Sequence, residues 1–122
     1  IKVNLNRWDA LDFSRDDINW DQYQWLEFDM YIEPQSALKF LSISVTLRDT
    51  SYQSSLFTIQ LIQSQFITGG KLQPGTWQHV QIPLDVFGPL LSHYITISLS
   101  GFSAIQDKPL TLYMDNVILR GK

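Results

Sequence analysis

The sequence contains no cysteine and carries little charge. Without a thiol, the chain forms no disulfide, no thiolate metal site and no cysteine nucleophile. Charged residues make up 17% of the 122 residues, whereas roughly 25% is usual for soluble domains. Eleven Gln and many Ser and Thr supply the missing polarity. The composition therefore predicts a neutral surface rich in hydrogen-bonding groups.

The sequence also lacks a basic cluster and a long apolar run. Nine Lys and Arg are scattered along a chain of net charge −3, which argues against nucleic acid as a partner. The apolar runs fall far short of the ~20 residues that span a bilayer, so no membrane partner is predicted. The sequence starts at Ile1 and shows no signal peptide. We expect a mature or excised piece of a longer, modular protein.

Carboxyl pairs suited to glycoside hydrolysis are scarce as well. The only glutamates are Glu27 and Glu33. On one strand they would stand roughly 20 Å apart at ~3.3 Å per residue, too far for that pair. His79 and His93 are isolated, and no Gly-x-Ser-x-Gly nucleophile elbow is present. Asp residues of neighbouring strands, for instance Asp9 or Asp12, could still converge, but nothing in their spacing singles them out. We predict that the chain is not an enzyme.

What the sequence does contain is period-two alternation of apolar and polar residues almost throughout, which is typical of half-buried strands. Hydrophobic residues make up 44% of the chain, enough for one core. The alternation predicts eight strands: Ile1–Asn6, Trp8–Phe13, Gln24–Ile32, Leu38–Arg48, Leu56–Gln63, Trp77–Leu84, His93–Ser100 and Leu110–Leu119.

Eight short strands separated by turn signals predict an all-β fold, a two-sheet antiparallel β-sandwich of the jelly-roll type. We expect residues 1–122 to form a single module. In jelly-roll order, strands one, eight, three and six form one sheet, and strands two, seven, four and five form the other. The outer face of the second sheet would then carry small hydroxyl residues flanked by rings and amides.

Such a face suits a polysaccharide, because aromatic planes stack on the C–H faces of sugar rings while amides, carboxylates and guanidinium groups bond the hydroxyls. Trp8, Asp12, Arg48, Gln60 and Tyr94 are the predicted binding residues. Trp8 could instead pack within the protein. Arg48 could instead pair with Asp49 or Asp12.

Further rings lie in loops. Tyr52 follows Arg48 and could extend the binding platform. Trp20, Tyr23 and Trp25 form the densest aromatic cluster, interleaved with Asn, Asp and Gln. Loop aromatics either plug the end of a sandwich or reach a ligand. Trp25 shares strand parity with Glu27, so it could simply cover the opposite sheet.

Four other rings are predicted to lie in the core. Trp77 follows a Pro-Gly turn, where a Trp usually anchors the next strand. Phe28, Phe87 and Phe102 are assigned to the core by the same reasoning.

Three segments carry a family resemblance: Leu26–Ile32 (LEFDMYI), Trp77–Leu84 (WQHVQIPL) and Leu112–Leu119 (LYMDNVIL). In this order and spacing they resemble the jelly-roll carbohydrate-binding modules appended to bacterial cellulases and other endoglucanases. The resemblance runs from about Trp8 to the end of the chain. It implies a secreted, non-catalytic module that holds a glycoside hydrolase of the same parent chain close to plant cell-wall β-glucan: cellulose, mixed-linkage glucan or xyloglucan.

Many of these modules hold a structural calcium ion near the first and last strands, and the matching position here is Asp115. Calcium takes six to eight oxygen ligands, so one carboxylate does not make a site. The N-terminal residues that often contribute ligands in the family are not clearly matched in this chain.

Two other functions remain open. One is a structural or adhesive sandwich that makes protein–protein contacts at the cell surface, where Tyr and Trp are also enriched. The other is a receptor for small sugars, with a closed pocket at the loop ends.

Overall fold

The computed structural model describes residues 1–7, 9–15, 22–48, 54–61, 65–87 and 94–121. For residues 14–15, 44–48, 54–59 and 94–95 it describes the backbone alone.

Within these residues, eight strands form two four-stranded antiparallel sheets, and this confirms the predicted sandwich. The strands are β1 (Lys2–Leu5), β2 (Ala10–Arg15), β3 (Tyr23–Ile32), β4 (Leu38–Arg48), β5 (Ser54–Gln60), β6 (Gln78–Pro83), β7 (Tyr94–Ser103) and β8 (Leu110–Gly121). Two 3-10 turns, η2 (Pro34–Ser36) and η3 (Leu84–Phe87), follow β3 and β6.

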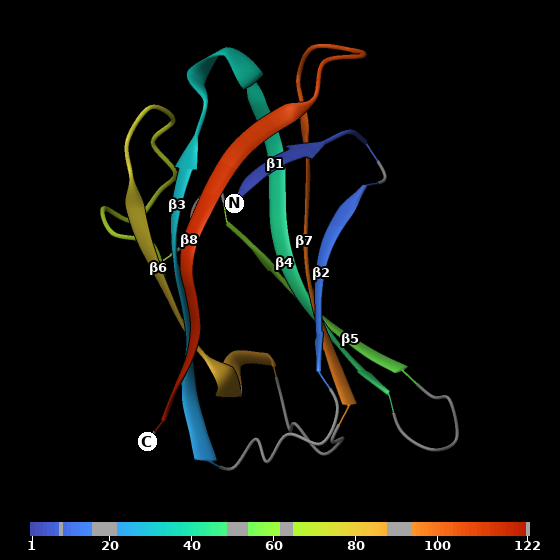
Figure 1. Cartoon of the computed structure of the whole chain (residues 1–122), viewed down its shortest axis with the longest axis vertical. Coiled ribbons are helices and arrows are strands. Elements are labelled where there is room, and N and C mark those ends of the chain that lie inside the picture. Colours follow the sequence, from blue (N-terminus) through green and yellow to red (C-terminus); the bar gives the residue numbers. More distant parts are fainter. Residues whose placement is uncertain (8, 16–21, 49–53, 62–64, 88–93, 122) are drawn as a thin grey trace.

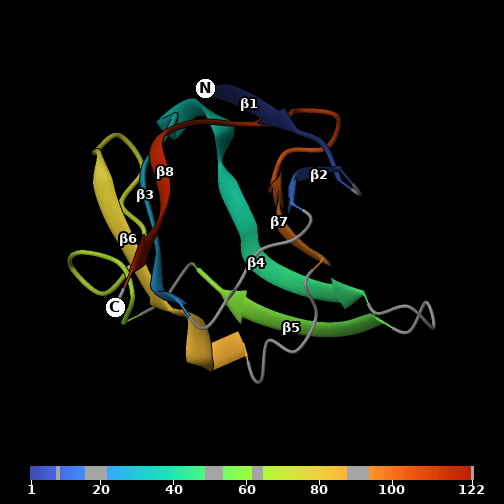
Figure 2. The ribbon, with the colours of Figure 1, turned by 60° about the horizontal axis from the view of Figure 1, so that its bottom comes forward.

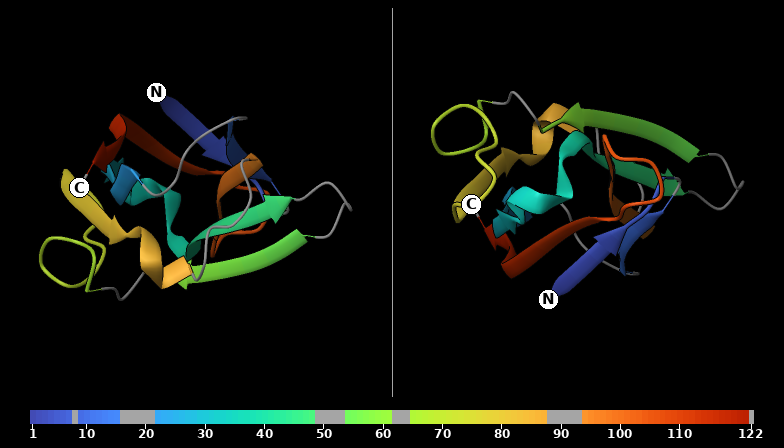
Figure 3. Two further views of the ribbon diagram at one scale, coloured as in Figure 1. Left: turned by 90° about the horizontal axis from the view of Figure 1, so that it is seen from below. Right: turned by 90° about the horizontal axis from the view of Figure 1, so that it is seen from above.

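The strand orders are β1-β8-β3-β6 in one sheet and β2-β7-β4-β5 in the other, as the jelly-roll pattern predicted. Figure 1 shows β3, β6 and β8 on one side of the molecule and β2, β7 and β5 on the other. The views along the long axis show the two layers facing each other (Figure 3). Each layer therefore has one inner face and one outer face.

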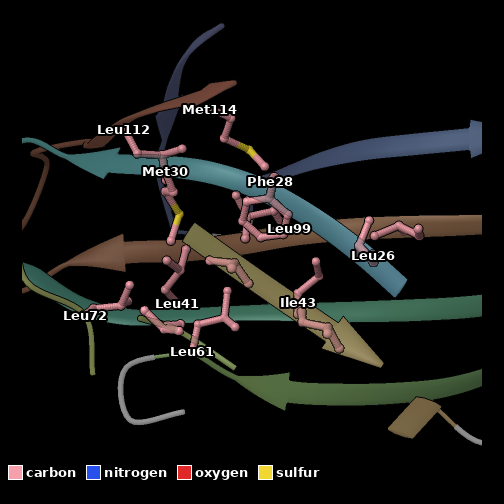
Figure 4. Packing of buried hydrophobic residues seen from close by; sticks show 14 of the residues in the cluster. Leu26, Phe28, Met30, Leu41, Ile43, Leu61, Leu72, Leu99, Leu112 and Met114 are labelled. Carbon is pink, nitrogen blue, oxygen red and sulfur yellow. The ribbon is translucent and has the colours of Figure 1, made fainter. Parts of the chain in front are cut away.

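The core lies between the two inner faces (Figure 4). From the first sheet, β3 contributes four buried side chains that alternate with outward ones: Leu26, Phe28, Met30 and Ile32. Leu41 and Ile43 of β4 and Leu99 of β7 meet them from the second sheet. Burial of each such side chain contributes about 1.5–3 kcal/mol. Phe28 and Phe87 are fully buried, which confirms their predicted place in the core.

Most strand ends differ from the predicted ones by one to three residues, and two of these differences concern aromatic residues. β7 continues to Ser103, three residues beyond the predicted end, and so includes Phe102. β6 begins at Gln78, so Trp77 precedes the strand. Among the described residues, no helix is long and apolar enough to cross a membrane.

Candidate functional site

The outer face of the β2-β7-β4-β5 sheet is built from small polar residues. Leu99 of β7 is buried between the sheets, and alternate residues of a strand point to opposite faces. Ser98 and Ser100 therefore lie on the outer face. The register places Ser98 opposite Asp12 of β2, and Ser100 opposite Ser42 of β4.

Hydrogen bonds link this polar row across three strands. The Ser98 hydroxyl donates to Asp12 Oδ1 at 2.5 Å. The hydroxyls of Ser42 and Ser100 share a hydrogen bond of 3.2 Å. Gln60, at the end of β5, pairs in register with Ser42, and its side chain is exposed. Ser42 is only 4% exposed, whereas Ser98 and Ser100 are half-buried. The face thus offers the hydroxyls of Ser98 and Ser100, an amide and one carboxylate on a rigid sheet.

An aromatic pair ends this row. Phe40 of β4 and Phe102 of β7 are cross-strand partners, with ring centroids 5.3 Å apart and ring planes 18° apart. The guanidinium carbon of Arg7 lies 5.1 Å from the centroid of the Phe102 ring. Both rings are half-buried. The arrangement places apolar surface directly beside the hydroxyl row.

The prediction that Phe102 lies in the core is wrong. Gly101 points inward, where a side chain would collide with the carbonyl oxygen of Phe40, so Phe102 points outward. Phe40 was missed altogether as a candidate. The sequence did carry a signal: Ser98, Ser100 and Phe102 alternate with Leu99 and Gly101, which puts Phe102 on the hydroxyl face.

A pocket of about 850 Å³ opens beside Phe102. It lies where β1 leads into β2 and β7 leads into β8; these two connections are neighbours in Figures 1 and 2. The pocket therefore continues the aromatic end of the hydroxyl face toward the loops.

The outer face of the β1-β8-β3-β6 sheet carries a second aromatic group. Trp77 is 54% exposed, so its predicted anchoring role in the core is wrong. Its ring centroid lies 5.7 Å from that of Tyr31, which in turn lies 6.1 Å from that of Tyr113. Trp77 stands one residue before β6, on the parity of exposed His79 rather than that of buried Gln78 and Val80.

Next to these rings is a network of charged side chains centred on Glu27, which is only 3% exposed. His79 Nε2 lies 2.8 Å from Glu27 Oε1, and His79 Nδ1 lies 2.8 Å from Asp29 Oδ1. Arg120 Nε donates to the other oxygen of Glu27. Asn116 Nδ2 donates to Asp29 Oδ2 at 2.8 Å. Both carboxylates are thus held by donors of neighbouring strands.

The network shifts two pKa values. The hydrogen bond to Asp29, and then that to Glu27, raises the pKa of His79 above 6.5, although burial opposes this. The hydrogen bonds from Asn116 and then His79 lower the pKa of Asp29 below 3.8. Because both oxygens of Glu27 and Asp29 and both ring nitrogens of His79 have partners within the network, its chemistry is that of a structural clamp between β3, β6 and β8.

The structure separates the predicted binding residues into two groups. Asp12 and Gln60 lie on the hydroxyl face of the β2-β7-β4-β5 sheet. Tyr23 and Trp25 belong to β3 in the other sheet, and both are half-buried. Trp25 shares the outer face of that sheet with Glu27. The alternative prediction, that Trp25 covers the sheet opposite the predicted binding face, therefore describes its position correctly.

The remaining predicted residues fall wholly or partly outside the description. Trp8, Trp20 and Tyr52 lie outside the described residues. Arg48 and Tyr94 pair with each other in the backbone register of β4 and β7, and their side chains are not described.

The donors around Asp115 do not by themselves fit calcium. Asp115 is exposed, and its Oδ1 accepts the backbone N–H of Asn116 at 2.8 Å. Among the residues that the structure describes, no three His, Asp or Glu side chains are placed to share a metal ion. One carboxylate falls short of the six to eight oxygens that calcium takes. The structural calcium stays a prediction from the resemblance.

Comparison with known proteins gives likeness of fold alone. No protein-family model and no curated protein matches the chain. Among solved structures, the chain is similar to SGBP-B from a complex xyloglucan utilization locus in Bacteroides uniformis, at 16% identity and a TM-score of 0.53. All of this chain is covered, but only 39% of that one.

A second similar structure is a non-crystalline cellulose specific carbohydrate-binding module, CBM28. Its TM-score is 0.54 and its identity is 16%, over 98% of this chain and 73% of that one. The β-sandwich predicted from the resemblance is therefore the fold that these carbohydrate-related proteins also have.

Proposed function

We propose that residues 1–122 form a non-catalytic carbohydrate-binding module that binds a β-glucan along the outer face of the β2-β7-β4-β5 sheet. The observation that carries this proposal is the hydrogen-bonded row of Asp12, Ser98, Ser100 and Ser42, which ends at the stacked rings of Phe40 and Phe102. Sugar hydroxyls would exchange hydrogen bonds with Asp12, Ser98 and Ser100, while the buried Ser42 supports Ser100 from below. The C–H faces of a sugar ring would lie against the apolar surface at the end of the row.

Two features of the site support binding rather than hydrolysis. Glu27 is engaged by His79 and Arg120, and Glu33 accepts the Tyr113 hydroxyl at 2.9 Å. Neither glutamate lies on the proposed binding face. That face also needs little ordering when it binds, because its groups stand on a sheet.

The wider role follows the resemblance and the titles of the similar structures. One of those proteins is described as cellulose specific and the other comes from a xyloglucan utilization locus. We propose cellulose, mixed-linkage glucan or xyloglucan as the ligand, a secreted bacterial location, and a glycoside hydrolase in the same parent chain.

Affinity electrophoresis against soluble polysaccharides tests this proposal. The panel is hydroxyethylcellulose, mixed-linkage β-glucan, xyloglucan, xylan and galactomannan. We expect retardation by the β-glucans. Gln60→Ala should weaken binding by about 1 kcal/mol, because its exposed amide loses a hydrogen bond to the sugar. Trp8→Ala and Tyr94→Ala extend the test to the rings predicted from sequence.

Trp77→Ala is the matched control, since its exposed ring lies on the other sheet. It should leave retardation unchanged. Loss of binding in Trp77→Ala, with Gln60→Ala unaffected, would move the site to the opposite face. Absence of retardation by every polysaccharide, from folded protein, would overturn the proposal.

A second candidate function is protein–protein contact at the cell surface. The observation that favours it is the cluster of the exposed Trp77 with the half-buried Tyr31 and Tyr113, because Trp and Tyr are enriched at protein interfaces. The absence of glycan binding described above is the result that would favour this candidate.

A further inference from the structure

The pocket beside Phe102 differs in charge from the rest of the chain. Its described lining includes three basic side chains, Arg7, Lys39 and Lys108, and one acidic side chain, Asp107. The whole chain has nine basic and twelve acidic residues and a net charge of −3. A third of its basic residues therefore line one pocket, which is locally positive.

Among the described residues, Asp107 is the acidic residue that lines the pocket, and Asp9 lies in the same connection as the lining residues Asn6 and Arg7. The Asp9 carboxylate accepts the backbone N–H of Asn6 at 2.9 Å, which ties it to the connection between β1 and β2. Asp107 adopts a positive φ of 62° in the connection between β7 and β8. Three cations still exceed these two anions. A concave site lined by one sign of charge concentrates the field and attracts the opposite charge.

The cations come from three separate segments, so they surround the pocket instead of following one strand. Arg7 precedes β2, Lys39 lies at the start of β4, and Lys108 precedes β8. The contact with the Phe102 ring orients the Arg7 guanidinium at the pocket wall. The two lysine ammonium groups supply compact point charges with three donors each, and the guanidinium adds a third positive charge.

Neutral groups complete the lining. Asn6 and Gln106 supply amides, and Phe102 and Ile105 supply apolar surface. A volume of about 850 Å³ lies within the range of small-ligand pockets and accommodates a sugar residue with a charged substituent. Because the pocket adjoins the neutral hydroxyl face, one glycan chain could contact both.

We propose that this pocket binds the carboxylate of a uronic acid residue in a glycan whose neutral part lies on the hydroxyl face. The inference rests on the proposed function and specifies the ligand further. Lys39 and Lys108 pair with the carboxylate, Arg7 adds positive charge at the pocket wall, and the amides of Asn6 and Gln106 bond the ring hydroxyls. Sulfated sugars share the anionic chemistry, and the test separates the two.

The experiment is isothermal titration calorimetry with three matched ligands: a cello-oligosaccharide, the same oligosaccharide oxidised to glucuronic acid at one terminal residue, and its 6-sulfated counterpart. We expect the uronate form to bind about fivefold more tightly than the parent, as one or two partly exposed ionic hydrogen bonds would give. The preference should decrease as salt increases. The sulfated form should bind less tightly than the uronate form.

The matched variants are Lys39→Met with Lys108→Met, and Lys71→Met as the control. Lys71 is an exposed lysine in the connection between β5 and β6. The double variant should lose the preference for the uronate form while it binds the parent oligosaccharide as before. The Lys71→Met variant should keep the preference.

Each other outcome overturns the inference. Equal binding of the parent and uronate forms removes the anionic subsite but leaves the proposed function standing. If the double variant keeps the preference for the uronate form, the two lysines are not part of the anionic subsite. Tighter binding of the sulfated form would assign the pocket to another anion. Failure of every oligosaccharide to bind overturns both proposals.

Discussion

At the scale of single residues, His79 is held between two carboxylates on neighbouring β3 positions. Each ring nitrogen lies 2.8 Å from a carboxylate oxygen, one of Asp29 and one of Glu27. These hydrogen bonds are strongest when the ring is protonated, because both nitrogens then donate and the ring carries a positive charge. The pKa of His79 is raised because the folded protein binds the protonated ring more strongly than the neutral one. The stability of the fold therefore depends on pH.

The free energy of unfolding should therefore fall as pH increases from about 6 to about 9. A group whose folded-state pKa is raised contributes fully below its ordinary value of 6.5, and this contribution is lost as pH passes through the raised value. The change should stay within about 1 kcal/mol, because His79 is 45% exposed and solvent screens it. Urea unfolding at a series of pH values measures it.

His79→Gln is the matched variant for this measurement. It keeps a hydrogen-bonding side chain but cannot titrate, so its stability should change less over that range. Asp29 affects stability at acidic pH instead. Its carboxylate has a lowered pKa, so the stability that it contributes is lost only as pH falls through that lowered value. A wild-type stability that stays constant or rises between about pH 6 and 9 would contradict the assignment.

At the scale of elements, β7 shows why a single glycine decides the orientation of the aromatic end. A Cβ built on Gly101 would lie 2.9 Å from side-chain carbons of both Leu110 and Leu41, and it would collide with the backbone oxygen of Phe40. The backbone of β4 cannot retreat without breaking its pairing with β7. Gly101 thus lets the core close while Phe102 faces outward.

Gly101→Ala should destabilise the fold by about 1–3 kcal/mol, the usual cost of overpacking a core. Gly121→Ala is the matched control in β8, because a Cβ there would approach the Gln22 backbone oxygen only to 3.4 Å, an ordinary contact. Urea unfolding of both variants gives the comparison. Equal stability of Gly101→Ala and the wild type would mean that β4 and β7 adjust without cost.

The same elements show how far the sequence could predict this molecule. Alternation predicted the strands, and the jelly-roll pattern predicted their order, because period two follows directly from strand geometry. It correctly placed Asp12 on the outer face. The predicted order also placed the strand of Trp25 in the other sheet from Gln60, as the structure has it. Trp25 was nevertheless a predicted binding residue, since parity and composition do not say which of two outer faces holds a ligand.

The two misplaced rings have the same cause. Trp77 was assigned to the core because a Trp after a turn usually anchors the next strand there, and Phe102 was assigned by the same reasoning. Both instead lie on outer faces, beside Phe40 and Tyr31 respectively. An apolar residue on an outer face breaks the simple rule that apolar means inward, and only the tertiary structure shows the neighbouring ring that shelters it.

At the scale of the whole molecule, the two outer faces have different chemistry although they share one core. One carries the hydroxyl row and the phenylalanine pair. The other carries Trp77 and the charged network around Glu27. Both sheets pack on the same buried cluster, so we expect the domain to unfold in one cooperative step. A ligand on either face would then stabilise all eight strands together.

Ligand binding should accordingly raise the free energy of unfolding of the whole domain. A cello-oligosaccharide at 100 times its dissociation constant should add about 2.7 kcal/mol, provided that it binds only the folded state. The Trp77→Ala variant should show the same increase, because its ring lies on the other sheet. Gln60→Ala, with weaker binding, should show a smaller one at the same ligand concentration. Urea unfolding with and without the oligosaccharide measures all three. If Trp77→Ala removed the stabilisation while Gln60→Ala kept it, the binding face would be the β1-β8-β3-β6 sheet.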